Sequence, residues 1–265
     1  MKTYRFICLL LALFVISFKM AQCSEIFPCP AQPIRLAYYA IPLLYGDNGN
    51  SGMDVEFINE LQARTGCQIS GTAMPRNRAW QEFADHHLDM LTAALKTPER
   101  NKLFYFIPYG QARIEFIGNP LLPARDEFLK NPALIMGVVR GIKYGPELQH
   151  YVDGLHQTNR VVEADSLQQL FLMLKAKRFS VAVADSQAFS VNANMLDLSE
   201  FKVLNFGIVD NSVINLAFSR QTFSAVEIKN WQMQINNMIR DGTARRIMSK
   251  YMSPEAVEAA SIRVK

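Results

Sequence analysis

The sequence lacks the motifs that mark common hydrolases, nucleotide-binding proteins and zinc enzymes. It contains no Gly-x-Ser-x-Gly, no His-Glu-x-x-His, no Walker-type Gly-Lys-Ser/Thr and no Gly-x-Gly-x-x-Gly pattern. Histidine is scarce, with four residues, and the adjacent His86 and His87 cannot share one helix face, so we expect no metal site. Without Cys-x-x-Cys, a thiol redox activity is not expected either.

A hydrophobic run long enough to cross a membrane is also missing. The longest uncharged apolar run, residues 6–18, is thirteen residues long, whereas a transmembrane helix needs about 20. Basic residues precede this run, and Ala21 and Cys23 stand at the minus-three and minus-one places, which is typical of a secretory signal peptide over residues 1–23. Gln22 is a poor fit to a lipoprotein signal, so we expect a soluble exported product.

The sequence has no excess of charge once this segment is removed. Residues 1–23 carry three of the 28 basic residues and no acid, so 25 basic and 24 acidic residues remain and the formal charge falls from +4 to +1. A nearly neutral chain gives no argument for nucleic-acid or membrane-surface binding. Its length suits one large domain or two small lobes, and 49% hydrophobic residues suffice for packed cores.

The most informative stretch is a short apolar run followed by a polar turn. Met90–Leu95 has the length of a buried strand. After it, Thr97, Pro98 and Glu99 form the pattern of an N-cap, a first-turn proline and a first-turn acid, so a helix is predicted there. Arg100 would then lie beside free backbone N–H groups, a setting that suits a carboxylate. The alternative is that Thr97 only caps and Arg100 pairs with Glu99 on the surface.

This stretch resembles a segment of the family 3 periplasmic solute-binding proteins, the receptors of ABC importers of polar amino acids. The shared pattern is an aspartate, a strand, Thr-x-x-Arg and Pro-Tyr over residues 89–109. The resemblance extends from about Ile34 to Tyr251, and the chain is identified as a divergent member of this family. The other matching segments, in order, are Ser51-Gly52-Met53-Asp54-Val55, Gly-Val-Val-Arg-Gly at 137–141, Ala-Val-Ala-Asp at 182–185 and Asp-Gly-Thr at 241–243.

The resemblance implies a type II periplasmic binding protein fold, an α/β architecture with two lobes. Each lobe would be a mixed sheet flanked by helices, and the ligand would lie in the cleft between the lobes. The expected order is a signal peptide (1–23), the first part of lobe 1 (24–112), lobe 2 (113–204) and a return segment of lobe 1 (205–265).

In the family, the arginine that matches Arg100 holds the α-carboxylate of the ligand, and the aspartate that matches Asp185 holds its α-ammonium. The resemblance therefore assigns ligand binding to Arg100, with Thr97 beside it, and to Asp185 from the opposite lobe. Arg78, in a Pro-x-x-Arg setting before a helix expected at about residues 79–87, is a second cationic candidate. From the residues alone, Asp185 could equally cap the next helical turn, and Arg78 could be an exposed or helix-pairing arginine.

Four further candidates lie where the chain departs from the family pattern. Tyr38 and Tyr39 end the first predicted strand, Ile34–Tyr39, and the family often has an acid at Tyr39. This disfavours lysine or arginine as the ligand and favours an aromatic-lined pocket. The alternative places one tyrosine in the core and the other on the rim. Lys143 and Tyr144 stand where the second lobe would complete the carboxylate clamp.

The cysteines predict one disulfide. Cys8 and Cys23 leave with the signal peptide, and an exported remaining pair favours a bridge. Cys29 and Cys67 each precede a predicted strand, and in the family fold these strands are parallel neighbours. We therefore predict a Cys29–Cys67 disulfide.

The sequence thus predicts a monomeric periplasmic receptor that closes around an amino acid or a similar zwitterion or carboxylate. It would deliver this ligand to a membrane permease without a cofactor, without nucleic acid and without catalysis. One alternative is a sensor that reports to a membrane signalling partner. The other is a dehydratase-type enzyme on the same scaffold, which would need a general acid in the cleft, with Glu163 and Glu115 as weak candidates.

Overall fold

The computed structural model describes residues 27–264 except 42, 47 and 48. The predicted signal peptide, residues 1–23, lies outside this range. Within the described range, no helix combines the length and the apolar character needed to cross a membrane.

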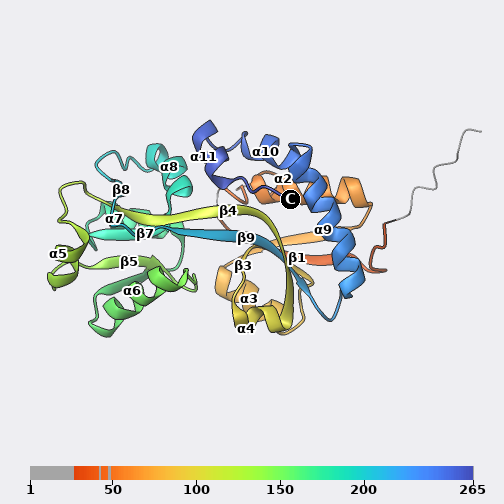
Figure 1. Cartoon of the computed structure of the whole chain (residues 1–265), viewed down its shortest axis with the longest axis horizontal. Coiled ribbons are helices and arrows are strands. Elements are labelled where there is room, and N and C mark those ends of the chain that lie inside the picture. Colours follow the sequence, from red (N-terminus) through yellow and green to blue (C-terminus); the bar gives the residue numbers. More distant parts are fainter. Residues whose placement is uncertain (1–26, 42, 47–48, 265) are drawn as a thin grey trace, which may run out of the picture.

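A mixed β-sheet runs through the whole molecule and supports helices on both faces (Figure 1). Its strand order is β2-β1-β3-β9-β4-β7-β5-β6, and β8 pairs with β4 at the side. The strands are β1 (Ile34–Tyr39), β2 (Ile69–Met74), β3 (Met90–Leu95), β4 (Phe104–Gly118), β5 (Met136–Val139), β6 (Val161–Ala164), β7 (Val181–Asp185), β8 (Lys202–Leu204) and β9 (Asp210–Ser219). The helices are α2 (Met53–Thr65), α3 (Arg76–Ala84), α4 (Pro98–Leu103), α5 (Arg125–Lys130), α6 (Pro146–Gln157), α7 (Leu167–Lys175), α8 (Ser186–Met195), α9 (Ala225–Arg240), α10 (Thr243–Met248) and α11 (Pro254–Ala260).

Two long antiparallel strands, β4 and β9, connect the lobes. They pair in two stretches that are separated by a bulge. In the first stretch, beside β3, Phe104–Pro108 pairs with Asn215–Ser219. The second stretch ends where Ile114 lies opposite Asp210. Beyond that point β4 pairs with β7 and β8 instead. The same two strands therefore belong to both lobes and carry the chain from one lobe to the other.

Lobe 1 has a core on each face of its sheet. Helices α2, α9 and α10 cover one face, where Trp231 is fully buried, and α3 covers the other, where Phe83 stacks on Phe104 with ring centroids 4.1 Å apart. Because side chains alternate along a strand, Tyr38 enters the first core and Tyr39 faces the second. Tyr38 and Tyr39 therefore lie on opposite faces of the lobe 1 sheet.

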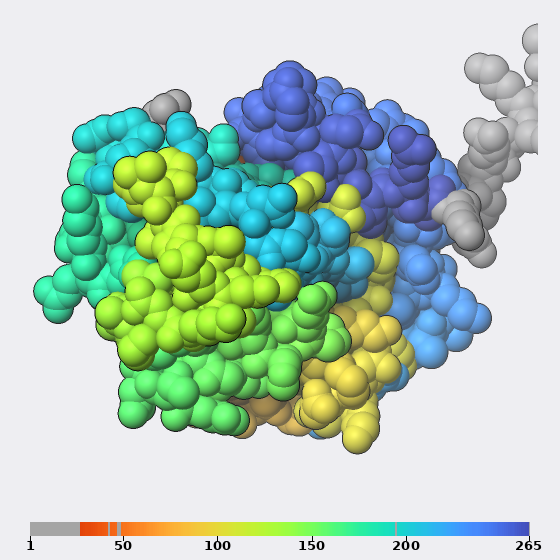
Figure 2. Space-filling view, turned by 60° about the vertical axis from the view of Figure 1, so that its left-hand side comes forward, coloured from red at the N-terminus to blue at the C-terminus, as the bar shows by residue number. Residues whose placement is uncertain are grey.

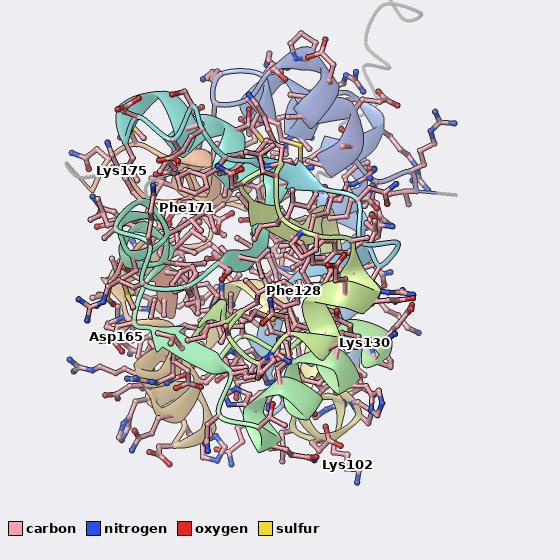
Figure 3. All side chains as sticks on the ribbon, turned by 90° about the vertical axis from the view of Figure 1, so that its left-hand side faces the viewer. Lys102, Phe128, Lys130, Asp165, Phe171 and Lys175 are labelled. Atoms are coloured by element: carbon pink, nitrogen blue, oxygen red, sulfur yellow. A yellow bond between two sulfur atoms is a disulfide. The ribbon has the colours of Figure 1, made fainter. Side chains whose placement is uncertain are left out.

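Lobe 2 is built in the same way. Residues Val181 and Val183 of β7 pack under α5 and α6, whereas Ala182 and Ala184 pack under α7 and α8. Figure 3 labels one buried aromatic residue from each core, Phe128 and Phe171. The predicted division at residues 112/113 and 204/205 stays a prediction, although the hydrophobic cores separate along the chain in a similar way.

Several local predictions agree with the structure. Strands β1 and β3 have the predicted limits, and Thr97 caps α4 by accepting a hydrogen bond from the backbone N–H of Arg100. The disulfide between Cys29 and Cys67 is confirmed, and β1 and β2 are parallel neighbours as expected.

One helix boundary was predicted wrongly. The helix expected at residues 79–87 is α3, which begins at Arg76 directly after Pro75 and ends at Ala84. Proline favours the start of a helix because it lacks a backbone N–H and has a fixed φ angle. This shift of three residues decides which arginine faces the ligand site, as described below.

The last helix, α11, lies between the lobes. Its Val257 and Ala260 are buried in a small cluster that contains Leu43 of lobe 1 and Ala188 of lobe 2. Figure 2 shows the dark-blue C-terminal segment beside the cyan segment that follows α8. The C-terminal segment therefore contributes to the contact between the lobes.

Candidate ligand-binding site

A cavity of ≈ 240 Å³ lies between the two lobes. It is found where the carboxyl ends of β1, β5 and β7 and the N-terminal ends of α3, α7 and α8 meet, which is where open α/β folds bind ligands. Its size is near the low end of the roughly 300–1,000 Å³ typical of small-molecule pockets. The cavity therefore suits a ligand of the size of a single amino acid.

Arg76 provides the positive charge in the lining. Its guanidinium carbon lies 3.9 Å from the centre of the Tyr39 ring, and both residues line the cavity. Tyr39 is buried, and this burial raises the pKa of its hydroxyl, so the ring stays neutral. Among the described residues, no carboxylate lies within salt-bridge distance of Arg76. An unpaired guanidinium on an aromatic ring is well placed to receive an anion.

Arg76, rather than the predicted Arg78, faces the cavity because of where α3 begins. Successive residues of an α-helix are about 100° apart, so positions two residues apart point about 200° apart. With Arg76 directed at Tyr39, Arg78 is turned to solvent, where its Nε lies 3.4 Å from Glu82. Recognising Pro75 as the helix start would have identified Arg76 from the sequence.

Arg100 does not line the cavity but contacts Leu95, a residue that does. Its guanidinium stacks on the Trp80 ring at 3.6 Å and donates a hydrogen bond of 3.1 Å to the carbonyl of Leu95, which lines the cavity. Burial lowers the pKa of Arg100, and the neighbouring charge of Arg76 adds to this effect. No carboxylate among the described residues lies within salt-bridge distance of Arg100. Arg76 and Arg100 therefore form a cationic pair around Tyr39.

Asp185 supplies the negative charge from lobe 2. It lines the cavity at the end of β7 and caps α8, where its Oδ1 accepts hydrogen bonds from the backbone N–H groups of Gln187 and Ala188, at 2.8 and 3.0 Å. The capping interpretation is therefore confirmed, and Asp185 also lines the cavity, while its role in ligand binding stays a prediction. Burial raises the pKa of Asp185 to about 6, and the charge of Glu115 adds to this rise.

A buried polar network supports the floor of the cavity. The Tyr109 hydroxyl donates to Oδ1 of Asp54 at 2.7 Å and accepts from the backbone N–H of Ala93 at 3.1 Å. Ala93 has a positive φ of 46° at a bulge in β3. Burial raises the pKa of Asp54 to about 6. Tyr109 and Ala93 both line the cavity, so this network fixes the wall opposite α8.

The other predicted residues lie away from the cavity in this structure. Tyr38 packs in the lobe 1 core against Tyr45, and Thr97 contributes its cap only to α4. Lys143 is exposed, whereas Tyr144 packs into the lobe 2 core, where burial raises the pKa of its hydroxyl. A ligand role for these four residues and for Arg78 stays a prediction.

The acids considered for catalysis are engaged in ion pairs outside the lining. Glu115 is buried against Arg113 at 3.0 Å, and Glu163 pairs with Arg140 at 2.9 Å. Asp165 does line the cavity, but its side chain is exposed at the edge of lobe 2 (Figure 3) and also pairs with Arg140. In the part of the chain that the structure describes, no group of three potential metal ligands is found.

The C-terminal helix forms one wall of the cavity, which no pattern in the sequence had indicated. Gln111 of β4 donates a hydrogen bond of 2.6 Å to the carbonyl of Ala259, and Gln187 of α8 donates one of 3.4 Å to that of Ala256. Ala260, together with Met248 and Met252, lines the cavity. Helix α11 is thus held by polar contacts from the crossing strand and from lobe 2.

Comparisons with solved structures identify the same fold. The arginine-, lysine-, histidine-binding protein ArtJ from Geobacillus stearothermophilus aligns with a TM-score of 0.70 and 14% identity, over 86% of this chain and 100% of that one. An ancestral arginine-binding protein bound to glutamine gives 0.68 and 17%, over 83% and 97%. The GluR0 ligand-binding core from Nostoc punctiforme in complex with L-glutamate gives 0.69 and 15%, over 84% and 100%.

These identities are low, so the structures establish the two-lobed fold and not the ligand. A comparison with curated protein sequences finds no significant match. Residues 36–254, most of the chain, match the family described as bacterial extracellular solute-binding proteins, family 3. The protein belongs to family 3 of the bacterial extracellular solute-binding proteins.

Proposed function

We propose that the protein is an extracytoplasmic receptor that closes around a small amino-acid-like ligand. The observation that carries this proposal is a pair of opposite charges on one cavity, Arg76 from lobe 1 and Asp185 from lobe 2. A zwitterion that contacts both would stabilise the closed arrangement, because a ligand shifts a conformational equilibrium by its difference in affinity for the two states.

The ligand carboxylate would bind at the cationic pair. Arg76 can contact it directly, and Arg100 adds a second positive charge from behind Tyr39. The N-terminal end of α3 favours an anion at the same place. The role of Arg100 expected from the sequence, a direct grip on the carboxylate with Thr97 beside it, would require its guanidinium to leave Trp80 when the ligand binds.

The ligand ammonium would bind to Asp185. The two backbone N–H groups of α8 hold its Oδ1 and fix the carboxylate at the cavity. A charged carboxylate accepts strong hydrogen bonds from an ammonium group. Because Asp185 belongs to lobe 2, this contact would connect the ligand to the lobe opposite Arg76.

Delivery of the ligand to an ABC importer is the cellular role that we propose. Several solved structures of this fold are binding or transport proteins for amino acids. A ligand-binding core of a receptor is found among them as well, which keeps open a role as a sensor that reports to a membrane partner. Loss of uptake of the labelled ligand in cells without this protein would support the importer, whereas unchanged uptake would favour the sensor.

Isothermal titration calorimetry of residues 24–265 against the twenty amino acids tests ligand binding. Arg76→Ala and Asp185→Asn should each weaken the binding of the best ligand by about 10- to 100-fold, because each removes a charge-assisted hydrogen bond worth roughly 1.5–3 kcal/mol. Arg78→Ala is the matched control, since it removes the same charge from the same helix on the solvent side. If all three variants bind like the wild type, the site is placed wrongly.

A further inference from the structure

The charged and polar groups of the cavity are few, and most of them already have partners. Among the described lining residues, only Arg76, Asp165 and Asp185 are charged. Asp165 is exposed and pairs with Arg140, so it does not offer a free carboxylate inside the cavity. This leaves one cation and one anion, which match the two charged groups of an amino acid backbone.

Most uncharged polar groups of the lining are also engaged, whereas the buried hydroxyl of Tyr39 has no hydrogen-bond partner among the described residues. Gln111 and Gln187 donate to carbonyl groups at α11, as described above. Ser166 caps α7 by accepting from the backbone N–H of Gln169 at 3.1 Å, and Ser212 donates to Asp210 at 2.9 Å. Tyr109 donates to Asp54. A polar ligand side chain would therefore find few free partners in the lining and would lose most of its hydration without compensation, which disfavours its binding.

The rest of the lining is apolar and comes from three parts of the molecule. Lobe 1 contributes aliphatic side chains after β1 and the side chain of Met53, and lobe 2 contributes Ile142 and Leu167. Met248 and Met252 complete this wall before α11, in the cluster that joins both lobes. Methionine side chains are flexible and adapt to apolar groups of different shapes.

We propose that the ligand is an amino acid with an apolar side chain of the size of leucine, methionine or phenylalanine. Its backbone charges would lie between Arg76 and Asp185, and its side chain would lie against the methionine wall, defined as Met53, Met248 and Met252. This inference rests on the proposed function and narrows the ligand class. The methionine wall would accept several apolar side chains rather than a single one.

Calorimetry with a graded set of ligands tests this class. Each additional methylene group that enters the wall should tighten binding by about fourfold, so leucine should bind at least tenfold more tightly than alanine. Arginine, glutamate and glutamine should bind at least tenfold more weakly than leucine. If one of these polar amino acids binds more tightly than all apolar ones, the inference fails while the proposed function stands. If no amino acid binds, both fail.

A pair of variants locates the apolar contact. Met252→Gln places an amide of similar size in the wall and should weaken leucine binding about tenfold, whereas glycine binding should change little. Met233→Gln, on the exposed surface of α9, is the matched control and should bind leucine like the wild type. If Met252→Gln fails to fold, the variant Ile142→Gln, at a partly exposed position, tests the apolar lining of the same cavity. Unchanged leucine binding in a folded variant would contradict the proposal.

Discussion

Raising the pH from 5 to 7 is expected to tighten ligand binding about tenfold through Asp185. Its pKa of about 6 in the free protein results first from burial and then from the charge of Glu115. At pH 5 about 9% of Asp185 would be ionised, and at pH 7 about 91%. Only the ionised form attracts an ammonium group strongly, so the protonated population does not bind.

The direction follows from linkage between binding and ionisation. A bound ammonium lowers the pKa of Asp185 because it favours the charged carboxylate. Binding therefore releases a proton when the pH is near or below 6, and the affinity falls as the pH is lowered through this range. The tenfold change between pH 5 and pH 7 corresponds to about 1.4 kcal/mol.

Calorimetry at several pH values, in buffers with different ionisation enthalpies, measures both the affinity and the released proton. Asp185→Asn should weaken binding at pH 7 and should remove the pH dependence. Asparagine is also a good N-cap residue, so α8 should remain intact. Asp197→Asn, at an exposed position in the same lobe, is the control and should behave like the wild type.

Two results would refute this reasoning. One is an affinity of the wild-type protein that does not change between pH 5 and 7. The other is a pH dependence that persists in Asp185→Asn, because a different group would then be responsible. Asp54 has a pKa of about 6 as well, and Asp54→Asn separates the two acids, since it should keep the tenfold change.

Two predictions concern stability. The buried Asp54 has a pKa raised from 3.8 to about 6, so the native state holds its proton more tightly than the unfolded state, and the free energy of unfolding falls as the pH rises from about 4 to about 6. Asp54→Asn keeps an oxygen that can accept from Tyr109. In denaturant titrations, its free energy of unfolding should therefore rise relative to that of the wild type by up to about 3 kcal/mol between pH 4 and pH 7. A difference between the two proteins that does not change with pH would contradict this. Replacing Cys29 and Cys67 by serine opens a loop with a sequence separation of 38 and should cost up to about 4 kcal/mol by the same measurement under oxidising conditions. Reducing the wild-type protein should give a similar loss, and a serine variant as stable as the oxidised wild type would contradict the expectation.

The sequence determined the elements whose signals are local. Ile34–Tyr39 and Met90–Leu95 are apolar runs with clear ends, and both are strands with these limits. Thr97 caps a helix because its side chain is in reach of an N–H three residues later. The order of several short motifs predicted the two-lobed fold, and the disulfide was predicted from the two cysteines that follow the predicted signal peptide and from the strand order of the family fold.

The composition of the ligand site depended on the tertiary structure. The choice between Arg76 and Arg78 rests on how α3 packs, because residues two positions apart on a helix point about 200° apart and only one of them can face the cavity. Arg100 has the local setting that the sequence predicted, but its stacking on Trp80 of α3 and its hydrogen bond to the carbonyl of Leu95 determine where its guanidinium lies.

The apolar wall could not be predicted from sequence order. It brings together Met53, Ile142 and Met252, which are separated by many residues and belong to different lobes or to the C-terminal segment. Each of these side chains alone is typical of an ordinary core. The sequence alone was therefore enough to predict strands β1 and β3, the caps, the disulfide and the family. Only the packing of the lobes and of α11 decided which side chains surround the cavity, because contacts between distant segments leave no periodic signal in the sequence.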